Sequence, residues 1–442
     1  MPDLADTVTT SCSTLNDILR WRAEHQPTRL AYVFTDEDKA GVHLTYADLD
    51  RQARLIAARL SSFGVEGERV LLLYPPGLDY ISAFFGCLYA GAIAVPVYPP
   101  RMNRNLLRLQ AIAADAQAKV ALTTAAVLSR VIPALDQTPA LGKLSWLATD
   151  DLKIDHDWHE PSVNNDTIAF LQYTSGSTGL PKGVVLTHSN LLHNSKLLAH
   201  AFGYTSESQC VSWLPMYHDM GLIGAIIQPL YGGFTCTLMS PLSFLQKPVR
   251  WLQAITRARG TISGAPNFAY DLCVRKIGPE ERAELDLSTW KVAFNGAEPI
   301  RPDTVERFAA AFQSCGFRAE AFHPCYGLAE ATLIVSGSKT SFLPAQRRLE
   351  ARTVMSCGGV LPDETIVIVN PESLTRCLPH EAGEIWVHGP SVAQGYWNLP
   401  EETEQTFHAT LAEMDDMNFL RTGDLGFLDD GELFVTGRLK DL

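Results

Sequence analysis

The hydrophobic residues in the first part of the chain form short runs that alternate with longer amphipathic segments. Residues 69–74 are a compact apolar run, typical of a strand covered on both faces, and a Pro-Pro-Gly turn separates them from a helical pattern over residues 80–90. A strand at 92–95, a helix at 106–118 and a strand at 119–123 follow. This βαβ alternation predicts an α/β protein built on a parallel, doubly wound sheet.

A second α/β stretch is predicted over about residues 190–335. Its expected elements are helices at 191–202 and 248–259 and strands at 235–239 and 290–294. From residue 354 the pattern changes to short β-rich runs separated by Pro, Gly and Asp, at 364–369, 383–387 and 432–435. These runs predict a small antiparallel or barrel-like unit.

Composition narrows the class of protein. The chain has 442 residues and a formal net charge of −13, which argues against wrapping a nucleic-acid backbone, although a local site can still be basic. Its nine cysteines include no C-x-x-C pair, as expected for free thiols in a reducing compartment. The N-terminus lacks the features of a signal peptide, and the apolar stretch 80–97 contains Gly86, Gly91 and Pro96. We therefore expect a cytoplasmic protein that binds no nucleic acid and has no stable membrane insertion.

The segment from residue 173 to residue 183, YTSGSTGLPKG, carries the first indication of chemistry. It lies between the predicted strands 167–171 and 184–186, and Ser189 or Asn190 is expected to cap the helix that follows. Its four Ser and Thr hydroxyls can donate to phosphate oxygens, its three glycines allow close backbone approach, and Lys182 adds a positive charge. We interpret it as a phosphate-binding loop; the alternative is a flexible linker.

Two common nucleotide motifs do not account for this loop. A Walker A sequence requires Ser or Thr after the lysine, whereas Lys182 stands between Pro181 and Gly183. A dinucleotide loop would open directly into a helix, whereas this one leads into a predicted strand.

The loop resembles the phosphate loop of the adenylate-forming superfamily of acyl-CoA synthetases, peptide-synthetase adenylation domains and luciferases. Further segments that resemble family motifs follow in the family's order, at residues 213–221, 295–299, 325–332, 421–426 and 437–441. The resemblance implies a large N-terminal adenylation (AMP-binding) domain over 1–436, made of two doubly wound α/β subdomains and a small distorted β-barrel. The implied boundaries are about 1–189 and 190–337 for the subdomains, 357–436 for the barrel, and 437–442 for a hinge stub, with the C-terminal domain and its adenylation lysine expected to be absent.

The resemblance also implies roles for individual residues, with ATP and Mg²⁺ as cofactors. The catalytic candidates are Lys182, His218, which would gate the carboxylate entrance, and Glu330, which would hold magnesium. Tyr326 would stack on adenine and Asp424 would accept the ribose hydroxyls. The full set expected to bind ATP or AMP is Thr174, Ser175, Gly176, Ser177, Thr178, Gly179, Asn295, Gly296, Ala297, Glu298, Tyr326, Gly327, Ala331, Thr332, Asp424 and Arg438.

Alternatives remain open for several of these residues. His218 can be a structural histidine, Glu330 a solvated helix acid, and Asp424 and Lys440 charges in turns; in the family, Lys440 would be the hinge. Ala329 stands where relatives often have Thr, so a phosphate hydroxyl contact at that point is either missing or supplied by Thr332. The candidates for the wall of an acyl tunnel, which can equally be core residues, are Trp213, Met216, Met220, Ile223 and Phe268.

Three segments resemble the fatty acyl-AMP ligase branch of this superfamily, namely residues 95–101, 239–251 and 325–332. That branch carries an insertion thought to prevent the use of coenzyme A. The candidate here, residues 336–355, is shorter than expected, which leaves the rejection of coenzyme A open; the alternative is a plain connecting loop.

The expected reaction converts a fatty acid and Mg·ATP to acyl-AMP and pyrophosphate, followed by transfer to the phosphopantetheine thiol of an acyl carrier protein in a polyketide, peptide or lipid pathway. We expect weak adenylation by residues 1–442 alone. A fatty acyl-CoA synthetase and a non-catalytic adenylate-binding module are the alternatives.

Overall fold

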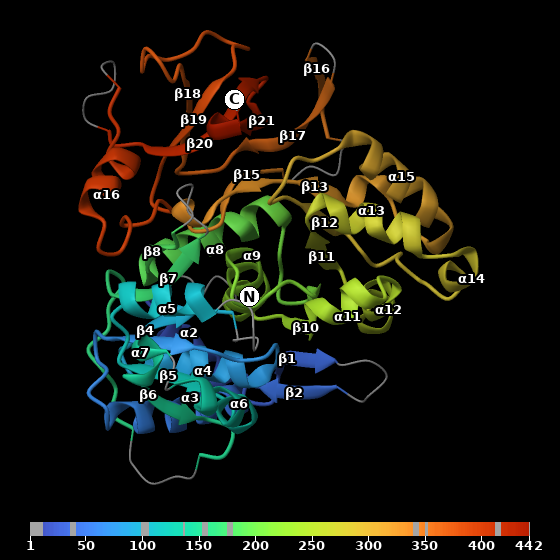
Figure 1. The fold of residues 1–442 in the computed structure, drawn as a ribbon. Coiled ribbons are helices and arrows are strands. Elements are labelled where there is room, and N and C mark those ends of the chain that lie inside the picture. The colour runs from blue at the N-terminus through green and yellow to red at the C-terminus, as the bar shows by residue number, and fades with distance from the viewer. Residues whose placement is uncertain are drawn as a thin grey trace.

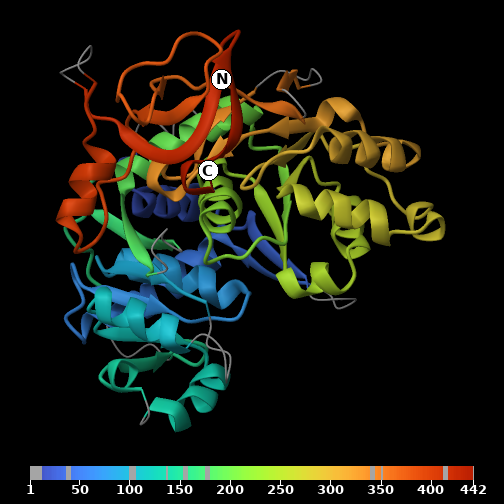
Figure 2. The same cartoon turned by 45° about the horizontal axis from the view of Figure 1, so that its top comes forward.

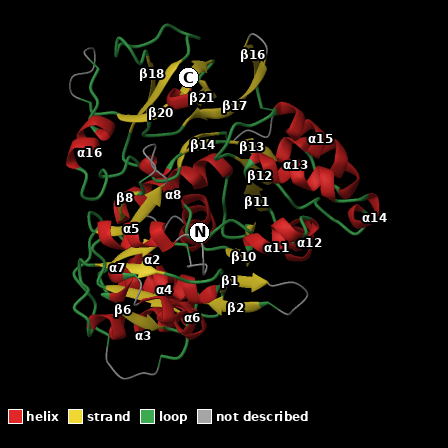
Figure 3. Ribbon diagram, viewed as in Figure 1, coloured by secondary structure: helices red, strands yellow, loops and turns green. Residues whose placement is uncertain are grey.

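The computed structural model describes residues 12–35, 41–98, 106–135, 138–152, 158–174, 180–338, 344–349, 352–411 and 417–441. Three sheets organise these residues, two of them mainly parallel and one antiparallel, with helices packed around the first two (Figures 1 and 3). The predicted α/β class is confirmed. Within the described segments, no helix combines the length and apolarity needed to cross a membrane.

The first sheet has six strands in the order β6-β5-β3-β4-β7-β8. All its pairs are parallel except β7 with β8, which are joined directly by the predicted phosphate loop. The strands are β3 (Arg69–Leu72), β4 (Ile93–Pro96), β5 (Val120–Thr123), β6 (Ser145–Ala148), β7 (Ile168–Thr174) and β8 (Lys182–Thr187). The apolar stretch near residue 90 is thus helix α4 (Leu78–Tyr89) followed by strand β4, as predicted.

The second sheet has seven strands in the order β13-β12-β11-β9-β10-β1-β2. Its strands are β1 (Leu30–Thr35), β2 (Val42–Thr45), β9 (Gln209–Ser212), β10 (Thr235–Met239), β11 (Ile262–Ala265), β12 (Val292–Asn295) and β13 (Phe322–Pro324). The expected division at residue 189 does not separate the two sheets, because β1 pairs in parallel with β10 and so places the N-terminal hairpin in the second sheet.

The third sheet is antiparallel and runs β14-β15-β17-β21-β20-β19-β18, with β16 paired to β17. Its strands are β14 (Tyr326–Gly327), β15 (Ile334–Gly337), β16 (Gln346–Leu349), β17 (Arg352–Val360), β18 (Thr365–Val369), β19 (Gly383–His388), β20 (Leu420–Asp429) and β21 (Glu432–Arg438). Two expectations need correction. Residues 326–337 belong to this sheet and not to the second unit, and among the described strands the pairing path ends at β14 and β18 without closing into a barrel.

The candidate insertion, residues 336–355, is partly described. Strand β16 pairs in antiparallel register with the start of β17, with Gln346 opposite Met355, and residues 339–343 and 350–351 lie outside the described part of the chain.

Helix α8 (His188–Phe202) lies between the first sheet and the third, which forms the orange and red part of Figure 1. Its N-cap is Thr187, whose hydroxyl accepts from the amide of Asn190 while Asn190 Oδ1 accepts from the amide of Thr187. The expected cap at Ser189 or Asn190 was therefore misplaced; Asn190 is the third helical residue of a capping box.

The remaining helices are α2 (Leu15–His25), α3 (Tyr46–Ser61), α5 (Leu106–Asp115), α6 (Ala125–Leu135), α7 (Pro139–Gly142), α9 (Asp219–Leu222), η1 (Ile223–Ile227), α10 (Gln228–Gly232), α11 (Pro241–Gln246), α12 (Val249–Ala258), α13 (Asn267–Lys276), α14 (Pro279–Arg282), α15 (Pro302–Phe312), η2 (Gln313–Cys315), η3 (Ala319–Ala321), η4 (Ala329–Ala331), α16 (Pro400–Phe407) and η5 (Leu439–Asp441). Most of the remaining helices surround the two parallel sheets, whereas η4, α16 and η5 contact β20 of the third sheet.

Candidate functional site

A cavity of about 720 Å³ lies where the three sheets meet. Leu439 and Lys440 of η5 line it, close to the C-terminal end that Figure 2 marks with C. Thr174 at the end of β7 lines it, and so do Gly296 and Ala297 just after β12. Ligands of α/β proteins bind at the carboxyl ends of parallel strands, which is where these residues stand. The predicted site residues that line the cavity are Thr174, Lys182, His218, Met220, Gly296, Ala297, Tyr326, Gly327, Glu330, Asp424, Arg438 and Lys440.

Glu330 lies on the short turn η4 and is held by a residue from a distant part of the chain. The hydroxyl of Tyr396 donates to Glu330 Oε1 at 2.9 Å. Burial raises the pKa of Glu330 above its usual range and nearby Asp219 and Asp424 raise it further, while the bond from Tyr396 opposes these effects. A cation in the cavity would oppose these effects and favour the ionised carboxylate, because an opposite charge nearby stabilises the charged form.

Lys182 begins β8 and also meets Tyr396. Its Nζ forms an ion pair with Glu402 of α16 and lies 5.0 Å from the centroid of the Tyr396 ring. Tyr396 thus contacts both the lysine and the carboxylate that the sequence singled out. The other predicted loop residues, Ser175, Gly176, Ser177, Thr178 and Gly179, lie outside the described residues.

Tyr326 and Asp424 also line the cavity, and their side chains contact one another. The Tyr326 hydroxyl donates to Asp424 Oδ2 at 2.7 Å, and Arg438 Nε lies 3.4 Å from Asp424 Oδ1. Burial raises the pKa of Asp424, whereas the hydrogen bond from Tyr326 and the charges of Arg438 and Lys440 lower it. An aromatic ring and a carboxylate are here positioned by two different strands, β14 and β20.

The turn that carries Asp424 is built by Glu384, which the sequence did not point to. Its buried carboxylate accepts from Arg421 at 2.9 Å and from the amide of Gly423 at 3.2 Å, and Gly423 has φ +69°. The amide of Asp424 donates to the hydroxyl of Thr422 at 3.1 Å. A left-handed glycine between two such contacts fixes the direction of the Asp424 side chain.

Four of the expected nucleotide contacts are placed elsewhere. Asn295 is fully buried, and Glu298 accepts from the backbone amide of Phe268. Ala331 is buried, and the hydroxyl of Thr332 donates to the carbonyl oxygen of Ser391 at 2.6 Å. None of the four lines the cavity as described, and the Thr332 hydroxyl donates its proton to Ser391 instead of facing the cavity.

His218 stands at an exposed position beside Asp219. The two side chains form an ion pair, and the charge of Asp219 raises the pKa of His218 above its usual range. The His218 side chain is 59% exposed, so it borders the cavity rather than lying within the core. This placement favours a role at the entrance over the structural alternative.

The expected acyl wall is mostly not at the cavity. Trp213, Met216 and Ile223 are buried in the core, and Phe268 is half exposed and packs edge-on against Trp213 at 6.2 Å. Only Met220 of this group lines the cavity. The apolar lining comes instead from the end of α8 and the residues just after it, from η1, from β12 and from the stretch between β13 and the start of β15. These residues are Leu198, Phe202, Tyr204, Gly224, Phe294, Cys325, Leu328, Ala329, Leu333 and Ile334.

Other lining residues were also missed, namely Glu384, Tyr396, Gln405, Thr406, Arg421, Thr422, Gly423 and Leu439. Arg421 to Gly423 share a predicted motif with Asp424, and this proximity was the available signal. Tyr396 follows a β-rich run in a Gly-Tyr-Trp sequence that no single-residue pattern distinguishes from an ordinary turn.

Comparisons with known proteins agree with this geometry. Residues 19–397 match the model of the AMP-binding enzyme family. The chain is 48% identical over 457 residues to the medium-chain-fatty-acid–acyl-carrier-protein ligase JamA of Moorena producens (strain JHB), covering 97% of this chain and 77% of the relative.

A second relative is named for a different acceptor. The chain is 39% identical over 464 residues to the putative fatty-acid–CoA ligase FadD21 of Mycobacterium tuberculosis (strain ATCC 25618 / H37Rv), covering 98% of this chain and 80% of the relative. Among solved structures, the fatty acyl-adenylate ligase of L. pneumophila in complex with acyl adenylate and pyrophosphate matches with a TM-score of 0.92 and 43% identity, over 98% of this chain and 78% of that one.

Proposed function

Because the chain belongs to the AMP-binding enzyme family, we propose that it is a ligase that activates a fatty acid with ATP, giving acyl-AMP and releasing pyrophosphate. The observation that carries this proposal is a single cavity that brings Lys182 and Glu330 at one end together with Tyr326 and Asp424 and an apolar wall. The acyl adenylate and pyrophosphate in the matching solved structure are the product pair of this reaction.

The phosphate end of the site is assigned to Thr174 and Lys182. The Thr174 hydroxyl can donate to a phosphate oxygen, and the ammonium of Lys182, now paired with Glu402, can neutralise charge that spreads onto the leaving pyrophosphate. The roles of Ser175 to Gly179 in the same loop remain part of this proposal.

Glu330 fits a magnesium ion. Its half-buried carboxylate lines the cavity and has a pKa raised by burial, and Mg²⁺ is usually bound by one or two carboxylates together with substrate phosphates. No group of three or more His, Cys, Asp or Glu that could form a complete metal cage occurs among the described residues, consistent with such a shared site. When bound, the ion would neutralise charge on the ATP phosphates.

The adenosine end is assigned to Tyr326, Asp424 and the backbone at Gly296 and Ala297. We propose that the Tyr326 ring stacks on adenine and that Asp424 accepts both ribose hydroxyls, with Arg438 beside it. The hydrogen bond from Tyr326 to Asp424 positions the carboxylate before the nucleotide binds. Lys440, which also lines the cavity, is proposed as the hinge.

The carboxylate of the fatty acid would attack the α-phosphate in line, so the protein's task is to orient the reactants and exclude water. His218 at the cavity border can orient the carboxylate, and the apolar residues of α8 and η1 can hold the alkyl chain. Burial of each methylene contributes about 0.8 kcal/mol, so this wall selects a fatty acid over a short acid.

The second step is proposed to transfer the acyl group to the phosphopantetheine thiol of an acyl carrier protein, as the name of the relative JamA suggests. Coenzyme A is the alternative acceptor, because a second relative is named for it and because the segment 336–355 is short. The nine cysteines are placed outside disulfide bonds, which supports placement in a reducing compartment such as the cytoplasm.

Pyrophosphate exchange with fatty acids of graded length tests the first step, and transfer from accumulated acyl-AMP to holo-carrier protein or to coenzyme A tests the second. Exchange that depends on fatty acid, followed by transfer to carrier protein only, is expected. Rapid acyl-CoA formation would identify coenzyme A as the acceptor. The absence of both pyrophosphate exchange and acyl-AMP would indicate a non-catalytic adenylate-binding module.

A further inference from the structure

The backbone directly after Glu330 makes a strained turn. Thr332 has φ +67° and ψ −67°, and the amide of Leu333 donates to the carbonyl oxygen of Ala331 at 2.8 Å, which closes a γ-turn around Thr332. A β-branched residue at positive φ is unfavourable, and such a conformation persists only where its surroundings hold it. The position of the Glu330 turn therefore depends on contacts from outside it.

The side chain of Asn194 on α8 supplies these contacts. Its Nδ2 donates to the carbonyl oxygens of Ile334 at 2.9 Å and Ala331 at 3.4 Å, and its Oδ1 accepts from the amide of Ile334 at 3.1 Å. Asn194 is fully buried, so these bonds do not compete with water. The hydrogen bonds from Asn194 hold the backbone on both sides of Thr332.

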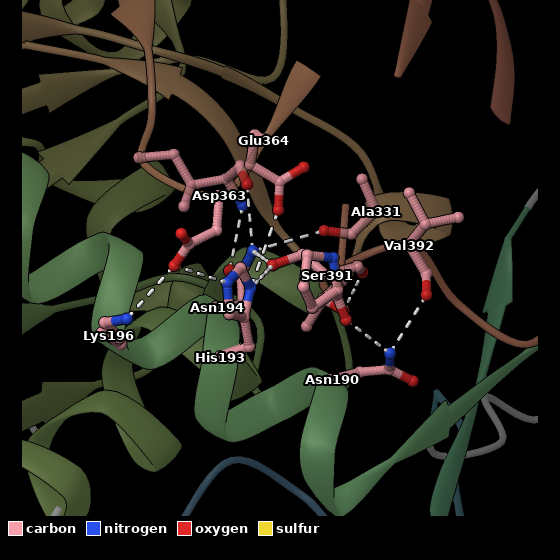
Figure 4. Close-up of polar contacts among 12 residues, drawn as sticks. Asn190, His193, Asn194, Lys196, Ala331, Asp363, Glu364, Ser391 and Val392 are labelled. Atoms are coloured by element: carbon pink, nitrogen blue, oxygen red, sulfur yellow. Dashed lines mark hydrogen bonds and ion pairs between the residues drawn. The ribbon is translucent and has the colours of Figure 1, made fainter. Parts of the chain in front are cut away.

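Ser391 completes the support from the third sheet's side. In Figure 4 the side chains of His193 and Asn194 point from α8 toward Ser391, and Ser391 Oγ lies 2.7 Å from His193 Nδ1 and 3.1 Å from Asn194 Nδ2. The carbonyl oxygen of Ser391 accepts from the Thr332 hydroxyl. The turn is thus held by one helix and one loop from different parts of the chain.

Helix α8 also connects this support to the phosphate end of the cavity. It follows β8, which begins at Lys182, without an intervening loop. Asn194 itself does not line the cavity, so any effect it has on substrates passes through the turn of Glu330.

We propose that Asn194 is a positioning residue for Glu330: by holding the strained turn at Thr332, its side-chain amide fixes the direction in which the Glu330 carboxylate enters the cavity. The proposal rests on the magnesium role proposed for Glu330. It predicts that loss of Asn194 weakens the use of Mg²⁺ while the affinity for the fatty acid is retained.

The test is the Mg²⁺ dependence of pyrophosphate exchange by Asn194→Ala. The half-saturating Mg²⁺ concentration is expected to rise about 10-fold, the usual lower effect of removing a group that orients a metal ligand, while the KM for fatty acid stays within about twofold. Asn16→Ala is the matched control, because Asn16 is also buried and donates to a backbone carbonyl, that of Leu88, far from the turn. It should leave the Mg²⁺ dependence unchanged.

A double substitution separates positioning from general stability. Glycine adopts positive φ without strain, so in a Thr332→Gly background the same loss of Asn194 should raise the half-saturating Mg²⁺ concentration by less than about threefold. An equal rise in both backgrounds, or a folded Asn194→Ala protein with unchanged Mg²⁺ dependence, would overturn the proposal.

Two further measurements remain informative if Asn194→Ala fails to fold. Asn194→Asp keeps the acceptor for the Ile334 amide and should give an intermediate rise in the half-saturating Mg²⁺ concentration. In the unaltered protein, the hydrogen of the Ile334 amide should exchange with solvent as slowly as those of core amides. Fast exchange there would contradict the hydrogen bonding by Asn194. Glu330→Gln, measured in parallel, separates the two hypotheses. If Glu330→Gln leaves the Mg²⁺ dependence unchanged, the magnesium role of Glu330 is rejected. If Glu330→Gln changes the Mg²⁺ dependence and Asn194→Ala does not, only the positioning by Asn194 is rejected.

Discussion

The hydroxyl of Tyr396 donates a 2.9 Å hydrogen bond to the carboxylate of Glu330, although 66 positions separate the two residues in sequence. The same ring lies 5.0 Å from the ammonium of Lys182. One tyrosine thus contacts both charged groups at the phosphate end of the cavity, and its hydroxyl can be removed without removing the ring.

Tyr396→Phe should therefore shift the acid limb of the pH–rate profile. The bond from Tyr396 stabilises ionised Glu330, so its loss raises the pKa of Glu330 further above its usual range. If exchange requires the ionised carboxylate, activity should be lost at a higher pH on acidification, with little change at alkaline pH. The pH dependence of kcat/KM for Mg·ATP measures this, and superimposable profiles for the two proteins would contradict it.

Lys182→Met should reduce pyrophosphate exchange about 100-fold, the scale on which one group that stabilises transition-state charge contributes to kcat. Binding of AMP should change little, because AMP has no β or γ phosphate. Lys196→Met is the matched control, since Lys196 is exposed and pairs with Asp363 at 3.2 Å away from the cavity. Equal losses in the two variants would remove the assignment of Lys182.

Gly224→Leu should shift the preferred fatty acid to shorter chains. Gly224 lines the apolar part of the cavity, and a Cβ built there meets Leu333 only at 3.8 Å, so a larger side chain can enter the space without a backbone clash. Each displaced methylene would cost about 0.8 kcal/mol of binding. Exchange rates across fatty acids of graded length measure the shift; a uniform loss at every length would indicate a folding defect instead.

Glu364 should make the protein less stable as pH rises. Burial raises the pKa of this carboxyl from 4.5 to about 7, so between these values the folded chain holds a proton that the unfolded chain releases. The contribution of Glu364 to the free energy of unfolding is largest below about pH 4.5. It falls by roughly 3 kcal/mol as the pH rises through 7.

Glu364→Gln, which is neutral and of similar shape, tests this with denaturant unfolding at several pH values. The variant should lose this decline and be the more stable protein at pH 8. Burial lowers the pKa of neighbouring His193, which acts in the opposite direction but is present in both proteins, so the difference between them reports Glu364. A difference that does not vary with pH would contradict the assignment.

The local elements were largely predictable because each depends on neighbouring residues. The strand predicted at residues 235–239 coincides with β10, and the helix at 248–259 contains α12 (Val249–Ala258). Apolar periodicity reports that a face is buried, and Gly and Pro report where the chain turns. The cap of α8 was missed by a few residues, because both Thr187 and Asn190 are good capping residues and only the backbone geometry distinguishes their roles.

The sequence by itself determined the α/β class and about half of the residues proposed to bind the nucleotide, namely those that are found at the cavity, since these lie in short segments with distinctive hydroxyl, glycine and charged residues. Tertiary structure alone decided that β1 joins the second sheet, that α8 rather than Trp213 and Met216 lines the apolar cavity, and that Tyr396 holds Glu330. The physical reason is the same in each case. A sequence pattern shows that a side chain is buried or polar, but its partner is fixed by packing between segments that lie far apart in the chain.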